Sequence, residues 1–292
     1  MTGFSGKGGS PMHELLQALK DPSLPFLRMA LIAGLMSSVA FGILGPIVTA
    51  RRIVNIAGSI SHSVLGGVGL ALFLFHEKGW LWCRPMLGAF AAALVSAAVI
   101  GWVTLYGKER EDTVIGAVWT VGMAAGVLFL SLTHAFVDPM SYLFGNILLL
   151  TKADLFMIAG LDAVILTVMA FCYNAFVAVC FDEEYAKLRG LNTGFLFLLI
   201  LVLVALTVVL FLPIVGTVLV IAMLTLPAAI AGLFAKHLWS MMAGSILIGM
   251  VFTALGIGLS YARDLPSGST IVVLLGAVYL ALVAAGKVRN KP

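Results

Sequence analysis

Nine long apolar runs constrain this chain more than any other feature of its sequence. A helix needs about 20 apolar residues to cross the roughly 30 Å hydrocarbon core of a bilayer. The runs that approach this length lie at residues 24–49, 53–75, 81–106, 113–133, 155–180, 193–212, 215–234, 238–261 and 269–286. Only 10% of the 292 residues are charged and 62% are hydrophobic, which excludes a water-exposed globule. We therefore predict an all-α integral membrane protein with about nine transmembrane helices.

The segments outside these runs complete the predicted organisation. We expect an extracytoplasmic tail at residues 1–23, one transmembrane domain at residues 24–286 and a cytoplasmic tail at residues 287–292. Residues 142–150 are apolar but too few to span a bilayer, so we expect a short re-entrant or interfacial helix there.

The positions of the basic residues predict the orientation. Lys and Arg are enriched in cytoplasmic loops of membrane proteins. Most of the 17 basic residues fall on the side that nine crossings share with the C-terminus: Arg51, Arg52, Lys108, Arg110, Lys187, Arg189, Lys236, Lys287, Arg289 and Lys291. We therefore expect the N-terminus outside and the C-terminus in the cytoplasm. The net charge of +4 reflects this bias and predicts no nucleic-acid partner.

His62 is the ionisable residue that lies deepest in a predicted span. It follows Arg51 and Arg52 by about ten residues, or about 15 Å of helix, which is near the middle of the bilayer. An ionisable group at that depth costs at least about 2.5 kcal/mol on insertion scales, so it is a candidate for a functional role. Asn55, Ser59 and His62 recur at i, i+4 and i+7 and therefore share one helical face.

Two interpretations of this polar face stay open on the residues alone. Neutral imidazole is a common ligand of Zn²⁺ and other first-row cations, which makes His62, Ser59 and Asn55 candidates for a metal pathway. Alternatively, the ring N–H of His62 bonds a carbonyl oxygen on a neighbouring helix. Small residues allow close contact between membrane helices. The glycines of this span with that expected role are Gly58, Gly66, Gly67 and Gly69.

One strongly charged loop, CFDEEYAKLRGLN at residues 180–192, lies between two long runs. Acidic residues begin it, basic residues end it and Gly190 follows, as in a short helix that matches its dipole and stops at glycine. Phe181, Tyr185 and Leu188 fall on roughly one face of that helix. The pattern suits docking into a groove of a soluble cytoplasmic partner, whereas a solvated turn is the plainer alternative.

Chemistry of other kinds has little support in the sequence. No Walker A, GxSxG or HExxH motif is present, so neither an enzyme nor a resident cofactor is predicted. Cys83, Cys172 and Cys180 lack metal-binding spacing, and we expect them to pack in the core. Asp154 and Asp162 begin at the predicted membrane edge and form no carboxylate pair at a span centre.

Five segments, taken in order, support a family resemblance. They are GPIVTARRIVNIAGSISHSVLGGVGLAL at 45–72, EDTVIGAVWTVGMAAGVLFLS at 111–131, VDPMSYLFGNILLLTKADL at 137–155, FDEEYAKLRGLN at 181–192 and VGTVLVIAMLTLPAAIAGLFA at 215–235. In these segments the chain resembles the membrane permease of the ABC-3 family, which consists of bacterial ABC importers for zinc, manganese or iron(II). The similarity extends over about residues 30–285.

The resemblance implies a division of labour among several partners. A dimer of the permease would form the pore in the bacterial inner membrane, and an extracytoplasmic metal-binding protein would deliver the cation. Two copies of a separate ATPase would bind ATP on the cytoplasmic side. A divalent metal ion is then the cargo, and this chain is a transport subunit and not an enzyme.

The resemblance also assigns the charged loop. Residues 181–192 match the coupling loop of the family, on which the ATPase docks, and Phe181 and Tyr185 would be apolar contacts of the docking helix. The positions that match the family pattern are Asp182, Ala186 and Gly190.

His62 matches the intramembrane histidine that lies on the metal route of the family. Many members carry an aspartate four residues earlier, where this chain has Gly58. One imidazole is a poor dication ligand, so His62 from two subunits, helped by Ser59 or Asn55, would have to suffice. Loss of the carboxylate favours borderline Zn²⁺ over hard Mn²⁺. We therefore predict zinc as the cargo, with manganese or iron(II) as the alternative.

Alternating access driven by ATP hydrolysis on the partner is the mechanism that we expect. A competing class is an ion-coupled secondary transporter, which usually needs a buried carboxylate to bind the driving ion. No span centre supplies such a carboxylate clearly in the sequence. A structural membrane scaffold would need neither a docking loop nor a midplane histidine.

Overall fold

A computed structural model describes residues 25–107, 109–133, 145, 150–263 and 265–286, and every regular element in these ranges is a helix. Eight of the helices are long and apolar enough to cross a membrane. The helices are α2 Pro25–Ala50, α3 Val54–Glu77, α4 Pro85–Tyr106, α5 Glu111–Ser131, α7 Lys152–Phe181, α8 Glu183–Leu188, α9 Thr193–Phe234, α10 Leu238–Arg263 and α11 Ser267–Ala284. The predicted all-α membrane class is confirmed.

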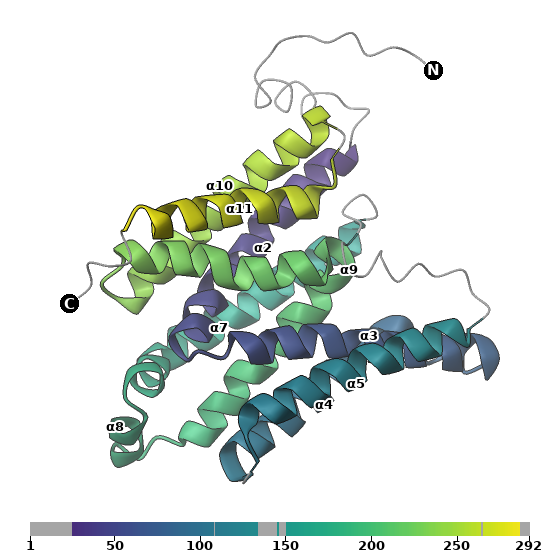
Figure 1. Cartoon of the computed structure of the whole chain (residues 1–292), viewed down its shortest axis with the longest axis horizontal. Coiled ribbons are helices and arrows are strands. Elements are labelled where there is room, and N and C mark those ends of the chain that lie inside the picture. The colour runs from purple at the N-terminus through teal and green to yellow at the C-terminus, as the bar shows by residue number, and fades with distance from the viewer. Residues whose placement is uncertain (1–24, 108, 134–144, 146–149, 264, 287–292) are drawn as a thin grey trace.

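Helix α9 contains two of the predicted spans. The sequence predicted a short connection between residues 212 and 215, but the helix continues there and is interrupted only at Gly216, with φ 81° and ψ 161°. That backbone conformation is open essentially only to glycine. Figure 1 shows that the chain turns back after the interruption, so the two halves of α9 cross the bundle in opposite directions. The eight long helices therefore supply nine crossing segments.

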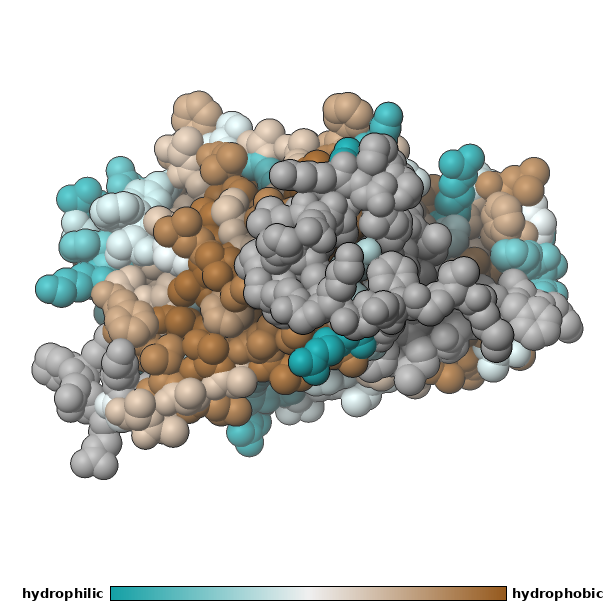
Figure 2. All heavy atoms as spheres, turned by 90° about the horizontal axis from the view of Figure 1, so that it is seen from above, coloured by the Kyte–Doolittle hydropathy of each residue, from teal (hydrophilic) through white to brown (hydrophobic). Residues whose placement is uncertain are grey.

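The bundle has polar ends and an apolar middle. Figure 2 shows hydrophobic residues in a broad band between hydrophilic residues that gather mostly near the two ends of the long axis. In Figure 1 the turn from α2 to α3, the turn from α4 to α5 and the short helix α8 lie toward one end, and the turn from α3 to α4 lies at the other. The helices therefore run roughly along the direction that crosses a bilayer.

Glycines set the close contacts of α3 with its two neighbours. A Cβ atom added at Gly67 would lie 2.1 Å from the carbonyl oxygen of Gly88 in α4. One added at Gly66 or Gly69 would lie 2.7 Å from the carbonyl oxygen of Gly122 or Gly126 in α5. These distances leave no room for any side chain, so α3, α4 and α5 form one tightly packed layer.

Several predictions concern segments at the margins of the described residues. The expected tails at 1–23 and 287–292 lie outside them, as does most of the expected short helix at 142–150. Gly145 is described and lies against the interruption of α9, because a Cβ added there would fall 2.4 Å from the backbone nitrogen of Gly216. Leu150 is buried in the core.

Candidate functional site

His62 lies on α3 against α5, where its imidazole stacks on the indole of Trp119. The two ring centroids are 4.6 Å apart and the ring planes differ by 5°. His62 is half-buried, and the side chain of Trp119 is 39% exposed. One face of the imidazole is therefore covered by a rigid aromatic ring, and the residue keeps partial access to its surroundings.

The predicted polar face divides in the folded chain. Ser59 is fully buried, and its hydroxyl donates a hydrogen bond of 2.9 Å to the carbonyl oxygen of Ile115 on α5. Asn55 lies in the first turn of α3 and is exposed. Within the described residues, no hydrogen bond joins Asn55, Ser59 and His62 to one another. The three residues share a helix face but occupy buried, half-buried and exposed surroundings.

Gly58 differs from the three other glycines of α3. The nearest atom to a Cβ added at this position is Cδ1 of Ile221, at 3.9 Å, which is an ordinary van der Waals distance. A Cβ atom one turn from His62 would therefore fit, so the backbone packing does not require glycine at this position.

Trp119 was not predicted as part of this site. Its indole N–H points to the sulfur of Met123 in the next turn of α5, with Nε1 3.2 Å from Sδ. The α5 sequence does not pair Trp119 with His62, because that pairing depends on the register between the two helices. The spacing of Gly122 and Gly126 was a signal only that α5 contacts another helix closely, since glycines four residues apart mark a close helix contact in membranes.

The described side chains supply few ligands for a resident metal. In residues 25–107, 109–133, 145, 150–263 and 265–286, no cluster of three or more His, Cys, Asp or Glu residues could hold a metal ion. Among the described histidines, His62 alone provides an imidazole near a span centre, with the buried hydroxyl of Ser59 one turn away. Such a site suits a cation that passes through better than one that stays bound.

Asp162 is a second ionisable residue inside a span, and its burial is a correction to the sequence-based expectation. It lies about 15 Å into α7 rather than at the membrane edge. It is only 8% exposed, and its Oδ1 atom has no hydrogen-bond partner in the structure. A span of this chain therefore does contain a buried carboxylate, and the sequence-based argument against an ion-coupled transporter no longer holds.

The charged loop forms the short helix α8 between α7 and α9. Asp182 caps its start by accepting a hydrogen bond of 2.9 Å from the backbone N–H of Tyr185. Gly190 follows its end with φ 74°, a conformation that favours glycine. Ala186 is fully buried and fixes the inner face of the helix. Phe181 belongs to the last turn of α7 and not to α8.

Apolar side chains project from this region into the surroundings. Tyr185 and Leu188 are exposed on α8, and Phe181 is exposed at the end of α7. Phe181 also lines a groove of about 530 Å³ beside the turn from α9 to α10, where Lys236 and His237 lie. The predicted docking residues thus form an exposed apolar surface at one polar end of the bundle.

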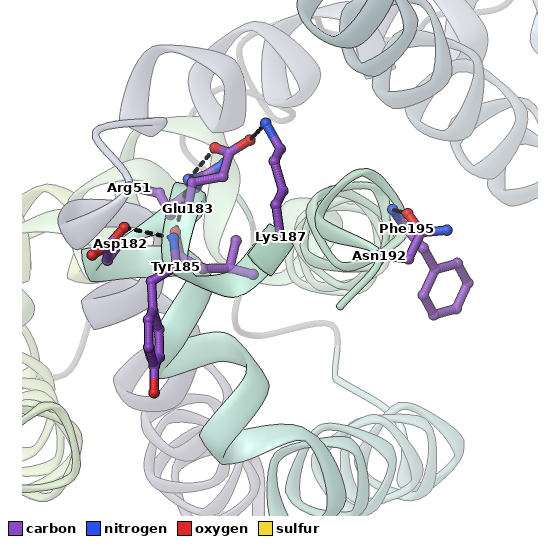
Figure 3. Close-up of polar contacts among 8 residues, drawn as sticks. Arg51, Asp182, Glu183, Tyr185, Lys187, Asn192 and Phe195 are labelled. Atoms are coloured by element: carbon purple, nitrogen blue, oxygen red, sulfur yellow. Dashed lines mark hydrogen bonds and ion pairs between the residues drawn. The ribbon is translucent and has the colours of Figure 1, made fainter. Parts of the chain in front are cut away.

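Glu183 of α8 forms ion pairs with two basic side chains (Figure 3). Its Oε1 atom lies 2.9 Å from Nζ of Lys187 one turn later, and its Oε2 atom lies 3.0 Å from Nη1 of Arg51. Hydrogen bonds from Lys187 and from Arg51 hold the pKa of the Glu183 carboxyl below its ordinary value of 4.5. The carboxylate is therefore ionised at neutral pH and paired on both sides.

Comparisons with known proteins agree with this architecture. The family model described as "ABC 3 transport family" matches residues 23–286. A Chlamydia trachomatis protein named "Probable metal transport system membrane protein" is 40% identical over 270 residues, covering 92% of this chain and 91% of that protein. The manganese import system permease protein ScaB of Streptococcus parasanguinis is 30% identical over 268 residues, covering 91% and 93%.

A solved structure supports the same relationship. PsaBC from Streptococcus pneumoniae in complex with Fab contains a chain with a TM-score of 0.80 and 30% identity, and the match covers 92% of this chain and 94% of that chain. The family model and these relatives each span nearly the whole transmembrane region. The chain therefore belongs to the ABC 3 transport family.

Proposed function

We propose that this chain is the membrane permease subunit of an ATP-driven importer for divalent transition-metal cations. The observation on which this proposal depends is the half-buried His62 on α3, in a member of the ABC 3 transport family. The full sequence contains no Walker A motif, so ATP would be bound and hydrolysed by a separate cytoplasmic ATPase. The exposed surface of Phe181, Tyr185 and Leu188 is the proposed docking site of that ATPase.

The proposed orientation puts α8 in the cytoplasm and the start of α2 outside. The end of the bundle that contains α8 also contains Arg51, Arg52 and Lys187, which fits the enrichment of basic residues on the cytoplasmic side. An extracytoplasmic metal-binding protein would then deliver the cation at the opposite end. Closure of the ATPase pair would move α8 and open the path along α3 to one side and then to the other.

His62 is the proposed transient ligand of the cation. Trp119 stacks on the imidazole and restricts its orientation, while the hydroxyl of Ser59 donates its proton to Ile115 and keeps its oxygen lone pairs. Because one imidazole binds a dication weakly, a second copy of the permease would contribute the equivalent His62. Asn55, exposed at the cytoplasmic start of α3, would meet the cation as it leaves.

Removal of the imidazole is the direct test. We expect His62→Ala to reduce ATP-dependent metal uptake into cells or proteoliposomes at least about tenfold, a loss of about 1.4 kcal/mol in stabilisation of the passing ion. Co-purification of the ATPase should be unchanged, because His62 is remote from α8. His76→Ala, near the outer end of the same helix, is the matched control and should transport normally. Normal uptake by His62→Ala would exclude His62 from the pathway.

Zinc is the proposed cargo on the chemistry around His62. Imidazole suits Zn²⁺, whereas Mn²⁺ prefers carboxylate and other oxygen ligands, and the position one turn before His62 is Gly58. Manganese is the second candidate, because a relative that is 30% identical is named a manganese import permease. Uptake measured with Zn²⁺ and Mn²⁺ in competition distinguishes the two, and preference for manganese would overturn the zinc proposal.

A single substitution tests the reason for that selectivity. A Cβ atom at residue 58 would make only an ordinary van der Waals contact, so we expect Gly58→Asp to fold and to add a carboxylate one turn from His62. We expect the ratio of manganese to zinc uptake to rise about tenfold, because an oxygen ligand of full charge favours the harder cation. Gly58→Asn has the same size without the charge and should change the ratio much less. Equal ratios in both variants would show that charge at residue 58 does not set selectivity.

A further inference from the structure

Arg51 lies in the three-residue turn that joins α2 to α3. The turn is closed by backbone hydrogen bonds from the N–H of Arg51 to the carbonyl oxygen of Ile47, at 2.9 Å, and from Ile53 to Val48, at 3.0 Å. Arg52 has a φ of 59°, which few residues other than glycine adopt. The end of α2 and the start of α3 are therefore held together with little freedom.

The guanidinium of Arg51 reaches three other helices. Nη1 donates hydrogen bonds to the carbonyl oxygen of Val179 in the last turn of α7, at 2.9 Å, and to Glu183 of α8, at 3.0 Å. Its Cζ atom lies 5.5 Å from the ring centroid of Phe197 in α9. The side chain is only 17% exposed. Arg51 thus contacts α7, α8 and α9, which follow one another in the chain.

The same residue is close in sequence to the candidate metal ligand. His62 follows in α3 at about 12 Å along the helix axis from the first residue of the helix, Val54. Because the turn is tight and α3 is packed against α4 and α5 through glycines, a displacement of Arg51 would move α3 as a whole. An ion pair whose two side chains are 17% and 35% exposed is still partly solvated and contributes modest stability by itself, so its geometric position is the more informative property.

We propose that Arg51 is the positioning residue that transmits movement of α8 to α3 and thereby couples ATP hydrolysis to movement of the metal ion. This inference depends on the function proposed above. Val179, Glu183 and Phe197 hold the guanidinium so that α8 and the α2–α3 turn move together. Without these contacts, α8 would still bind the ATPase, but its motion would reach the metal pathway only weakly.

The test compares Arg51→Gln with Arg52→Gln in the full complex with its ATPase. Arg52 is the neighbouring exposed arginine and serves as the matched control. We expect Arg51→Gln to co-purify with the ATPase and to hydrolyse ATP, while the metal taken up per ATP hydrolysed falls about tenfold. Arg52→Gln should keep the wild-type ratio. Arg51→Lys, which keeps the charge but loses the planar fork, should give an intermediate ratio.

A second variant separates coupling from folding. Glu183→Gln removes the same contact from the α8 side, and we expect it to lower the ratio in the same direction. An unchanged ratio in Arg51→Gln, or in Glu183→Gln if Arg51→Gln does not assemble, would overturn the inference. Failure of the function proposed above has a different signature, because the wild-type chain would then show neither ATPase association nor ATP-dependent metal uptake.

Discussion

His62 and Asp162 are ionisable residues in apolar helices, but their surroundings differ. His62 has an aromatic partner and partial exposure, whereas Asp162 is buried against neighbouring helices with one carboxylate oxygen unpartnered. A buried polar group without a hydrogen bond costs about 1–3 kcal/mol, and more when charged. The two residues therefore represent different cases: His62 is the proposed ligand of a passing cation, and we expect Asp162 to lower the stability of the span in which it lies.

Asp162→Leu should raise the thermal midpoint of the detergent-purified protein. Leucine has no polar atom to bury, and insertion scales favour it over aspartate by roughly 3 kcal/mol at a helix centre, which is an upper limit for the gain in stability. Asp154→Leu on the same helix is the control. Asp154 accepts a hydrogen bond of 2.8 Å from the backbone N–H of Thr151, so its loss should instead lower stability by about 1 kcal/mol.

The uptake assay decides whether Asp162 also has a role in transport. A stabilised Asp162→Leu protein that still imports metal would show that the carboxylate is only a defect of packing. A protein that is folded but inactive would assign Asp162 to the transport cycle.

The polar contacts of individual residues show which features of the site could be predicted from the sequence and which could not. The depth of His62 follows from counting residues along a span, and the cap at Asp182 follows from local helix rules. The stacking of Trp119 on His62 and the bond from Arg51 to Glu183 join residues far apart in sequence. Such pairs depend on helix register, which hydrophobic periodicity does not determine.

At the scale of elements, α8 is a short helix that has little stability of its own. Six residues are too few to be helical in isolation, so α8 depends on its cap at Asp182, on burial of Ala186 and on the ion pairs of Glu183. The exposed side chains of Tyr185 and Leu188 take no part in these contacts. The surface proposed to bind the ATPase is therefore held by the opposite face of the same helix.

The stability of α8 should depend on pH through Glu183. Because the folded-state pKa of Glu183 is lowered, its pairing with Lys187 and Arg51 stabilises the helix fully above the ordinary pKa of 4.5. That stabilisation is lost as the pH falls below 4.5 and through the lower folded-state pKa. The side chain is 35% exposed, so the effect should be under about 1 kcal/mol.

Hydrogen exchange at the backbone amides of Tyr185 and Ala186, corrected for the intrinsic pH dependence of exchange, measures this change. We expect protection to decrease in the acidic range in the wild-type chain. Glu183→Gln should have lower protection at neutral pH and a flatter profile. A wild-type profile as flat as that of the variant would contradict a role of this ion pair in holding α8.

The elements themselves were largely predictable, because apolar runs between charged turns define membrane spans. The connection between residues 212 and 215 was the exception. The predicted spans ended at 212 and began again at 215, but α9 continues through Pro213, because proline is tolerated within membrane helices, and the interruption occurs at Gly216. The conformation of Gly216 is matched by the close approach of Gly145, which no local sequence rule predicts. The position of this bend is therefore set by tertiary packing.

At the scale of the whole molecule, the nine crossing segments place the start of α2 and the end of α11 at opposite ends of the bundle (Figure 1). The same arrangement separates the turn from α3 to α4 from α8. In the proposed function, one end would meet a partner outside the cell and the other a partner in the cytoplasm. The proposed function requires this separation, because delivery and energy input occur on different sides.

Single cysteines in a cysteine-free background test the orientation. Leu188 on α8 and Trp82 in the turn from α3 to α4 are both strongly exposed. We expect a membrane-impermeant thiol reagent to label Trp82→Cys in intact spheroplasts, and Leu188→Cys only in inverted vesicles. Labelling of both from the same side would contradict the three crossings that separate them, α4, α5 and α7, and the opposite pattern would reverse the proposed orientation.

The bend at Gly216 also has a consequence for how the chain is synthesised. Two spans joined by one non-helical residue have no hydrophilic loop between them, so no polar segment has to be moved across the bilayer at this point. The halves of α9 can leave the translocation channel together as a preformed hairpin, with their backbone amides already bonded. A ribosome that stops before residue 234 would leave this hairpin incomplete. Nascent chains of that length should therefore be recognised and degraded more readily than chains that end after α9.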